Sequence, residues 1–128
     1  MSTEQNKAVV RRFMTEVLQG GDLDVLDEVL APNYVNRGMG GADTAGFKEI
    51  LKGIGAMGLD MHFTILDMVA EGDLVIASFT SEVTRASGEK LAADGLTLYR
   101  LADGKIVVDD PFTRPDLAQL LGMAPPAS

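Results

Sequence analysis

The sequence contains no cysteine, no tryptophan and a single histidine, His62. Without cysteine the chain has no disulfide, no thiolate nucleophile and no cysteine-ligated zinc, and one histidine leaves little room for a histidine-rich metal site. No apolar run approaches the ~20 residues of a membrane span. The first residues show no basic stretch followed by an apolar run, so no signal peptide is predicted. We therefore expect a cytoplasmic protein without a structural metal.

Basic side chains are also scarce, with 11 Lys and Arg against 19 Asp and Glu and a formal net charge of −8. Such a negative field repels phosphate backbones and anionic lipids, so neither a nucleic acid nor a membrane is an expected partner. The remaining composition, 128 residues of which 46% are hydrophobic, is typical of one globular domain. We expect that domain over residues 1–123, followed by a disordered tail over 124–128.

The first half of the chain has helical periodicity. Residues 2–5 have the form of a capping box, and the helix that they open is expected to reach about Gln19. A short helix is expected over 23–30, and a third begins at Asp43 or Thr44. These segments are amphipathic, so each must bury one face against another element.

The second half alternates apolar and polar residues with a period of two. Strands are expected over 60–70, 74–85, 89–102 and 105–112, followed by a short C-terminal helix. Helices first and a strand meander afterwards predict an α+β fold, with the helices gathered on one face of a curved antiparallel sheet.

The sheet face toward the helices is expected to enclose an apolar pocket. Phe79 belongs to the consistently apolar face of its strand, and small residues share one parity on the next strand. Small side chains leave space, and a glycine lets a strand bend. A collapsed core of small residues is the alternative. The residues predicted to bind an apolar ligand are Phe13, Phe79, Ala93, Gly95, Phe112 and Met57.

Several strings of the sequence resemble one protein family, the SnoaL-like polyketide cyclases. That family belongs to the cone-shaped, nuclear transport factor 2-like superfamily, together with ketosteroid isomerase, scytalone dehydratase and limonene epoxide hydrolase. The match covers nearly the whole chain and identifies the fold better than the reaction. The strings are NKAVVRRF at 6–13, GDLD at 21–24, LAPNYVN at 30–36, VAEGDLV at 69–75 and LYRLADGKIV at 98–107.

The resemblance implies a cone formed by a bent sheet and three helices, an apolar interior, and no metal or organic cofactor. It also implies an acidic residue near the last strand that performs acid–base catalysis of an intramolecular aldol closure. The chain departs from the family pattern here, because it has no tryptophan after the Gly-Lys-Ile segment.

The epoxide hydrolase relatives suggest a second comparison. They have a Tyr-x-Asn on the first strand, which Tyr34 and Asn36 match, and an Asp on the last strand, which Asp110 matches if one residue is deleted. Their Arg-x-Asp is replaced by Phe-Thr-Ser at 79–81. Without that arginine the epoxide oxygen would lack its expected activation.

Asp110 is the first candidate for a general acid or base, because burial at the rim of an apolar cone would raise its pKa toward neutrality. Its neighbour Asp109 would point to solvent on a regular strand, although Pro111 leaves open which of the two faces inward. Tyr34 and Asn36 lie two residues apart on one face of a short strand. The alternatives are two exposed aspartates in a turn, a half-buried tyrosine and a turn-closing asparagine.

The sequence thus predicts a cofactor-independent cyclase that acts on a hydrophobic carbonyl compound. Asp110 would move the proton, and Asn36 and Tyr34 would hold the enolate oxygen. An epoxide hydrolase or isomerase using the same pocket is the second hypothesis, and a non-catalytic small-molecule-binding dimer is the third. A homodimer is expected through the outer face of the sheet, with His62 facing solvent or the partner; that face carries Ser78, Thr80, Glu82, Leu96 and Leu98.

Overall fold

The computed structural model describes residues 2–115. The expected C-terminal helix, the end of the domain at 123 and the tail over 124–128 lie outside the described residues. Helix α1 (Thr3–Arg12) begins with the predicted capping box: the Ser2 side chain accepts from the Gln5 backbone N–H, and the Gln5 side chain accepts from the Ser2 N–H. This exchange satisfies two backbone donors that a helix start leaves free.

The first helix extends to Gln19, as predicted, but it changes character at Phe13. The segment η1 (Phe13–Gln19) is a π-helix, whose wider turn is typical of functional sites. It ends where the Gly20 backbone N–H bonds the Thr15 carbonyl at 3.0 Å. Phe13, Met14 and Val17 of this segment are buried.

Two more helices complete the helical layer. Helix α2 (Leu23–Val29) is capped by Asp22, and α3 (Thr44–Ala56) is capped by Asp43, one of the two residues predicted for that role. Between them the chain forms strand β1 (Leu30–Asn36) and a single 3₁₀ turn, η2 (Arg37–Met39).

The sheet has five strands in the order β1-β5-β4-β3-β2. The last four form the predicted antiparallel meander: β2 (Asp60–Glu71), β3 (Leu74–Thr84), β4 (Lys90–Ala102) and β5 (Lys105–Arg114). Strand β1 pairs with β5 in parallel, so the sheet is mixed rather than wholly antiparallel. A parallel pair needs a long connection, which α3 and the first three strands of the meander supply.

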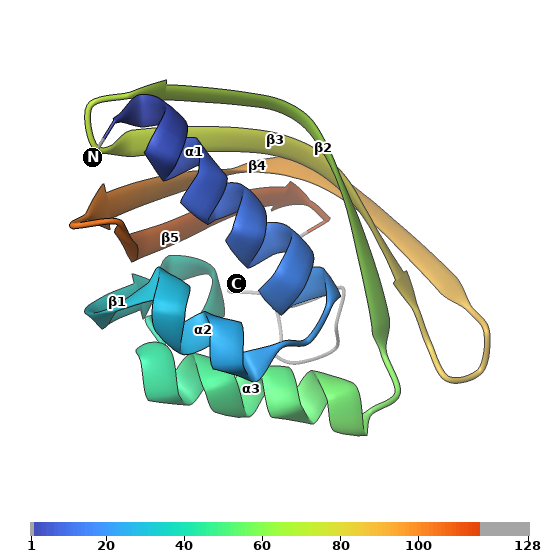
Figure 1. Ribbon diagram of the computed structural model, residues 1–128. Coiled ribbons are helices and arrows are strands. Elements are labelled where there is room, and N and C mark those ends of the chain that lie inside the picture. Colours follow the sequence, from blue (N-terminus) through green and yellow to red (C-terminus); the bar gives the residue numbers. More distant parts are fainter. Residues whose placement is uncertain (1, 116–128) are drawn as a thin grey trace.

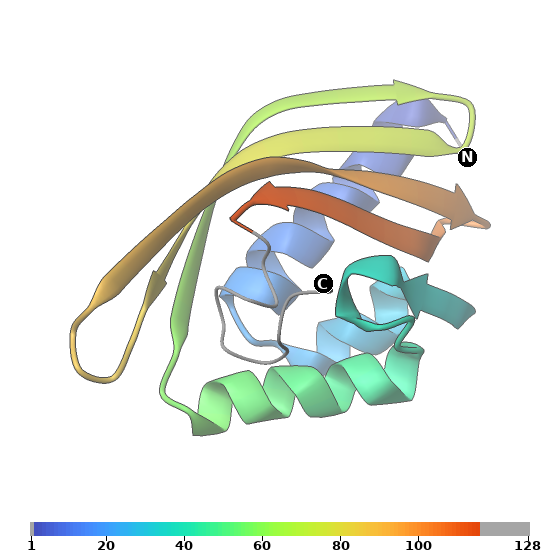
Figure 2. The ribbon, with the colours of Figure 1, turned by 180° about the vertical axis from the view of Figure 1, so that it is seen from behind.

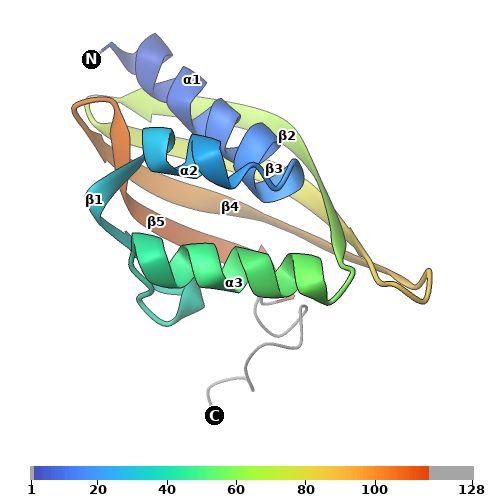
Figure 3. The ribbon, with the colours of Figure 1, turned by 60° about the horizontal axis from the view of Figure 1, so that its bottom comes forward.

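The helices lie on one face of the sheet, and the long strands bend around them. Figure 1 shows α1 crossing the sheet, and Figure 3 shows α2 and α3 on the same side. Seen from behind in Figure 2, the far ends of β3 and β4 extend beyond the helices. This is the expected α+β cone of the nuclear transport factor 2-like type.

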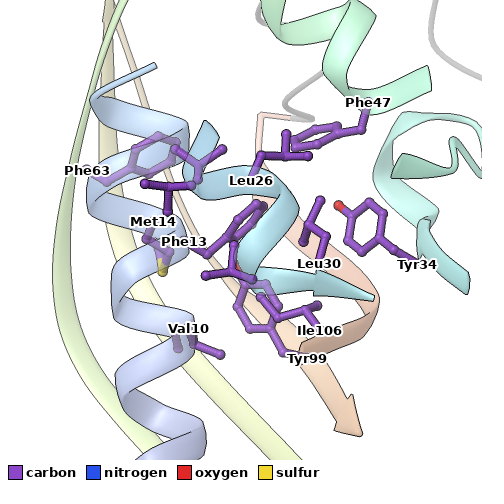
Figure 4. Packing of buried hydrophobic residues seen from close by; sticks show 14 of the residues in the cluster. Val10, Phe13, Met14, Leu26, Leu30, Tyr34, Phe47, Phe63, Tyr99 and Ile106 are labelled. Carbon is purple, nitrogen blue, oxygen red and sulfur yellow. The ribbon is translucent and has the colours of Figure 1, made fainter. Parts of the chain in front are cut away.

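Aromatic rings from different elements meet in the core (Figure 4). The Phe13 ring centroid lies 6.0 Å from that of Tyr99, edge to face, and 6.1 Å from that of Phe47. These separations are within the range of favourable ring pairs. These contacts hold η1 against β4 and α3. They form part of the interior into which the side chains of Tyr34 and Tyr99 project.

Candidate functional site

Asp109 is the acid that faces the interior, and a bulge in β5 places it there. Arg100 pairs with Val108 and Leu101 pairs with Ile106, so Val107 is an extra residue on β5. An extra residue reverses the alternation of faces beyond it. Ile106 and Asp109 are therefore both buried, although they are three residues apart.

The prediction that Asp110 faces the pocket and Asp109 faces solvent is therefore wrong. Asp110 keeps 22% of its side-chain surface exposed and lies 3.8 Å from Arg37 through its Oδ2 atom, while Asp109 is 4% exposed. The physical reason is the bulge, because regular alternation from Ile106 would have turned Asp110 inward.

Tyr34 and Asn36 bond directly to Asp109. The Tyr34 hydroxyl donates to Asp109 Oδ2 at 2.7 Å, and Asn36 Nδ2 donates to the same oxygen at 3.3 Å and to the Tyr34 hydroxyl at 3.1 Å. The parallel pairing places Asn36 beside Asp109, and Tyr34 follows on the same face because the strand period is two. The structure thus brings together three of the four predicted catalytic residues.

The Asn36 amide is held in one orientation by the turn that follows it. Its Oδ1 atom accepts from the backbone N–H groups of Gly38 at 2.9 Å and Met39 at 3.1 Å. The amide can satisfy these donors only with Nδ2 turned toward Asp109. Gly38 in turn packs on Pro111, where a Cβ would overlap the proline ring.

Burial dominates the electrostatics of this cluster. The pKa of Asp109 is raised to about 7, chiefly by burial; the Tyr34 hydrogen bond opposes this rise, and the nearby charge of Asp110 contributes to it. Burial and the Asp109 charge raise the pKa of Tyr34 and of Tyr99 well above the ordinary value. Near neutral pH, Asp109 can therefore gain or lose a proton while both tyrosines keep theirs.

An apolar cavity of about 40 Å³ lies against Asp109. Its aliphatic and aromatic lining comes from η1, α3 and the inner face of the sheet, with polar groups only at the Asp109 end. Three methionines, Met14, Met39 and Met61, are part of it. The lining residues are Met14, Leu18, Asn36, Met39, Phe47, Leu51, Ile54, Met61, Phe63, Phe79, Thr97, Tyr99, Asp109 and Pro111.

Of the six residues predicted to bind the ligand, only Phe79 lines this cavity. Phe13 is fully buried in the core instead. Met57 is 50% exposed just after α3, and Phe112 is 57% exposed on the outer face, because the bulge reverses the face of every later residue on β5.

Ala93 and Gly95 also fall outside the cavity. Ala93 is buried beside a depression that the outer residues of β2, β3 and β4 line, and Gly95 borders a second depression with Phe112. Their inward parity was expected to bring them to the ligand, but they lie farther along the bent strands than the Asp109 cluster.

Two hydroxyl-bearing residues on β4, Thr97 and Tyr99, line the cavity and were not among the predicted site residues. Tyr99 pairs with Asp109 across the sheet. The signal that could have found it was available, since Tyr99 has the parity of Ala93 and Thr97. His62, by contrast, is exposed on the outer face of β2, as predicted.

A curved mixed sheet that encloses a buried acid beside an apolar cavity defines a cone-shaped α+β domain of the nuclear transport factor 2-like class. The family model described as the SnoaL-like domain matches residues 10–108, and the chain belongs to that family. No curated protein sequence matches the chain. Among residues 2–115, no helix is long and apolar enough to cross a membrane.

Solved structures agree with this assignment. A protein from Acidithiobacillus ferrooxidans that is proposed to be a polyketide cyclase is 25% identical, with a TM-score of 0.76 over 98% of this chain and 100% of that one. IdmH from Streptomyces antibioticus, also proposed to be a polyketide cyclase, is 24% identical over 92% and 99%, with a TM-score of 0.74. An LEH-like epoxide hydrolase from M. tuberculosis is 18% identical over 93% and 90%, with a TM-score of 0.78.

Proposed function

We propose that this protein is an enzyme of polyketide cyclase type, which moves a proton on an uncharged, hydrophobic carbonyl compound with Asp109 as the acid–base group. The observation that carries the proposal is a carboxyl group that is buried at an apolar cavity and has its pKa raised to about 7. A base with a pKa near the working pH combines the correct protonation state with a useful driving force for proton transfer.

The contacts of Asp109 divide its two oxygens between two roles. Within residues 2–115, Tyr34 and Asn36 both donate to Oδ2, and no side-chain hydrogen bond joins Oδ1. Oδ1 is therefore the oxygen that we assign to the substrate. Tyr34 and Asn36 stabilise and orient the carboxylate, a change from the enolate-holding role that the sequence predicted for them.

In this mechanism Asp109 takes a proton from the carbon next to a substrate carbonyl, and the electron pair of the broken C–H bond forms an enolate. The hydroxyl groups of Thr97 and Tyr99 on β4 are the donors that we assign to the enolate oxygen. The enolate carbon then attacks a second carbonyl of the same molecule, and Asp109 returns the proton to the new alkoxide. The protons balance within this cycle, so the step as written needs no cofactor.

Opening of an epoxide by water is the second candidate, since Tyr34, Asn36 and Asp109 form a set of polar groups that could hold a water molecule. It receives less support, because Asp109 is the only acid that lines the cavity within the described part of the chain. The position of the relatives' second acid is Ser81, which is buried and donates to the Ala93 carbonyl at 3.4 Å.

The proposal can be tested without the natural substrate. 2-Tetralone is an uncharged aromatic ketone whose α-hydrogens exchange with D₂O under base catalysis, and NMR follows that exchange. Asp109→Asn should lower the protein-catalysed exchange rate roughly 10²–10⁴-fold, the usual contribution of a general base. Asp110→Asn is the matched control, because it makes the same change one residue along and outside the cavity, and it should keep the rate within about threefold.

Equal rates for wild type and Asp109→Asn would remove Asp109 from catalysis. A wild-type rate no higher than that of buffer alone, at saturating 2-tetralone, would favour a non-catalytic binding protein.

We also propose that the chain forms a homodimer through the outer face of the sheet. Ser78, Leu96 and Phe112 lie in one row across β3, β4 and β5. Leu96 is 41% exposed and Phe112 is 57% exposed, and exposed apolar side chains in such a row are typical of an interface.

A further inference from the structure

A thin apolar wall separates the Asp109 cavity from a depression on the surface. The depression has a volume of about 340 Å³ and lies where the end of η1, α3 and the start of β2 meet. Four side chains line both spaces: Leu18, Leu51, Ile54 and Met61. A side chain that borders both spaces has the cavity on one side and the depression on the other, so one layer of residues divides them.

The cavity by itself is too small for an organic ligand. A space of about 40 Å³ holds about one water molecule. Pockets for small organic molecules usually measure about 300–1,000 Å³. The depression, at about 340 Å³, lies at the lower end of that range, but a ligand bound there reaches Asp109 only if the depression and the cavity join.

We propose that the cavity and the depression are two halves of one ligand site, which join when the four wall side chains rotate. The occupant that we infer is an elongated, uncharged hydrophobic molecule, with its carbonyl end at Asp109 and its other end in the depression. The placing of the carbonyl end rests on the proposed function. The existence of the joined site does not.

The lining chemistry supports this class of ligand. Within the described residues, no Lys, Arg or His lines the cavity, so nothing there would neutralise an anionic group. The depression carries polar groups at its rim, among them Lys52 and Asp60. A polar far end of the ligand can stay hydrated there while its body displaces the wall.

Helix α3 has a local weakness where it contributes to the wall. Gly53 and Gly55 flank Ile54, and a Cβ added at either glycine would meet nothing within 4 Å. Packing therefore does not require glycine, although each glycine costs a helix up to about 1 kcal/mol relative to alanine. The π-helical geometry of η1, which carries Leu18, marks the opposite side of the wall. Both features favour a wall that opens at low cost.

Binding of Nile red, an uncharged and elongated carbonyl dye, tests the joined site. If the open state is roughly 0.1–10% populated, a variant that holds the wall open should bind the dye at least about tenfold more tightly. Leu18→Ala should do so, as should Leu51→Ala on the other side of the wall. Leu23→Ala is the matched control, because Leu23 lines the depression but not the cavity. It should leave the affinity equal or weaker.

Quenching of tyrosine fluorescence by acrylamide gives a second measurement. The chain has two tyrosines and no tryptophan, and both tyrosines lie at Asp109 and are 1% exposed. Leu18→Ala and Leu51→Ala should raise the quenching constant severalfold, whereas Leu23→Ala should not change it. Circular dichroism confirms that each variant is folded, and either wall variant alone suffices for the test.

Unchanged dye affinity and unchanged quenching in a folded wall variant would overturn the joined site. So would a dye that loses affinity in Leu23→Ala and gains none in the wall variants, because it would occupy the depression alone. Neither measurement depends on turnover. The test of the joined site therefore remains valid whatever the outcome of the Asp109→Asn exchange test.

Discussion

Asp109 is stabilised by hydrogen-bond donors, not by a cation. Among the residues that the structure describes, none that lines its cavity is basic, and Arg37 lies beside Asp110 instead. Two neutral donors cannot fully replace the water that a carboxylate loses on burial. The acid therefore holds its proton to a higher pH than an exposed aspartate does.

This raised pKa makes a prediction about stability. The pKa of Asp109 is about 7 in the folded protein, against an ordinary value of 3.8. Between these values the unfolded chain loses the proton and the folded chain keeps it, so the free energy of unfolding falls as pH rises from about 4 to 7. The loss attributable to Asp109 is on the order of 4 kcal/mol, and it levels off above pH 7. Urea denaturation over this pH range measures it.

The side chain introduced by Asp109→Asn cannot ionise, so this variant should lack the part of the slope of unfolding free energy against pH that Asp109 causes. Its free energy of unfolding should therefore rise relative to that of wild type as pH increases. Asp110→Asn should keep most of the slope, because the side chain that it alters is partly exposed. Parallel pH profiles for wild type and Asp109→Asn would contradict a raised Asp109 pKa.

At the residue scale, the sequence predicts which side chains share one face of a strand better than it predicts whether that face points into the core. Tyr34 and Asn36 were placed together because two residues on a strand return to one face, and that rule is local. The choice between Asp109 and Asp110 depends on Val107, which is extra only relative to the pairing of β5 with β4. Bulges depend on a neighbouring strand, so β5 alone could not predict this one.

At the scale of elements, the turn η2 connects the backbone of β1 to the acid on β5. The Asn36 side chain accepts from the η2 backbone, and the loop that follows η2 returns to the Asn36 backbone: the Asn36 carbonyl accepts from the Gly41 N–H, and the Asn36 N–H donates to the Ala42 carbonyl. Gly38 within this turn packs against Pro111, two residues after Asp109. The turn therefore determines both the Asn36 amide orientation and the local separation of β1 and β5.

Gly38→Ala should disturb both the orientation of the Asn36 amide and the separation of β1 and β5. The added methyl group would overlap the rigid Pro111 ring, and overpacking of this kind typically costs about 1–3 kcal/mol of stability. The strand shift that relieves the overlap should also lengthen the Asn36–Asp109 bond and lower the 2-tetralone exchange rate at least severalfold. Thermal denaturation and the exchange assay measure the two effects.

Gly53→Ala is the control, because nothing lies within 4 Å of the added Cβ. It should leave stability equal or raise it by up to about 1 kcal/mol. A Gly38→Ala protein as stable and as active as wild type would show that the turn does not position Asn36.

The elements themselves were largely predictable, since their signals are local. Ser2 and Asp22 cap helices as expected, and each meander strand begins and ends within two residues of its predicted bounds. The π-helical turn at Phe13 and the parallel pairing of β1 were not predicted. Both depend on packing between segments far apart in the chain, which periodicity does not record.

At the scale of the whole molecule, the bent sheet has two faces with different uses. The inner face and the helices enclose the Asp109 cavity, and the outer face carries the exposed apolar row. The small residues on β4 were expected to leave an interior space, but of these only Thr97 lines the cavity, whose other walls are mostly large apolar side chains. The position and volume of the space depend on the distances between the helices and the bent sheet, which no sequence pattern specifies.

The outer face supplies the last prediction. If Leu96 and Phe112 lie in a homodimer interface, a charge at Phe112 must be buried without a partner when two chains associate, at a cost of at least about 2 kcal/mol. Phe112→Glu should therefore raise the dimer dissociation constant roughly thirtyfold or more in sedimentation velocity. Met57→Glu is the matched control, because Met57 is 50% exposed but lies at the end of α3, outside the row of Ser78, Leu96 and Phe112. A wild-type chain that sediments as a monomer, or equal dissociation constants for the two variants, would contradict this interface. Because Phe112 follows Asp109 on the same strand, an interface there would also restrain the strand that carries the acid.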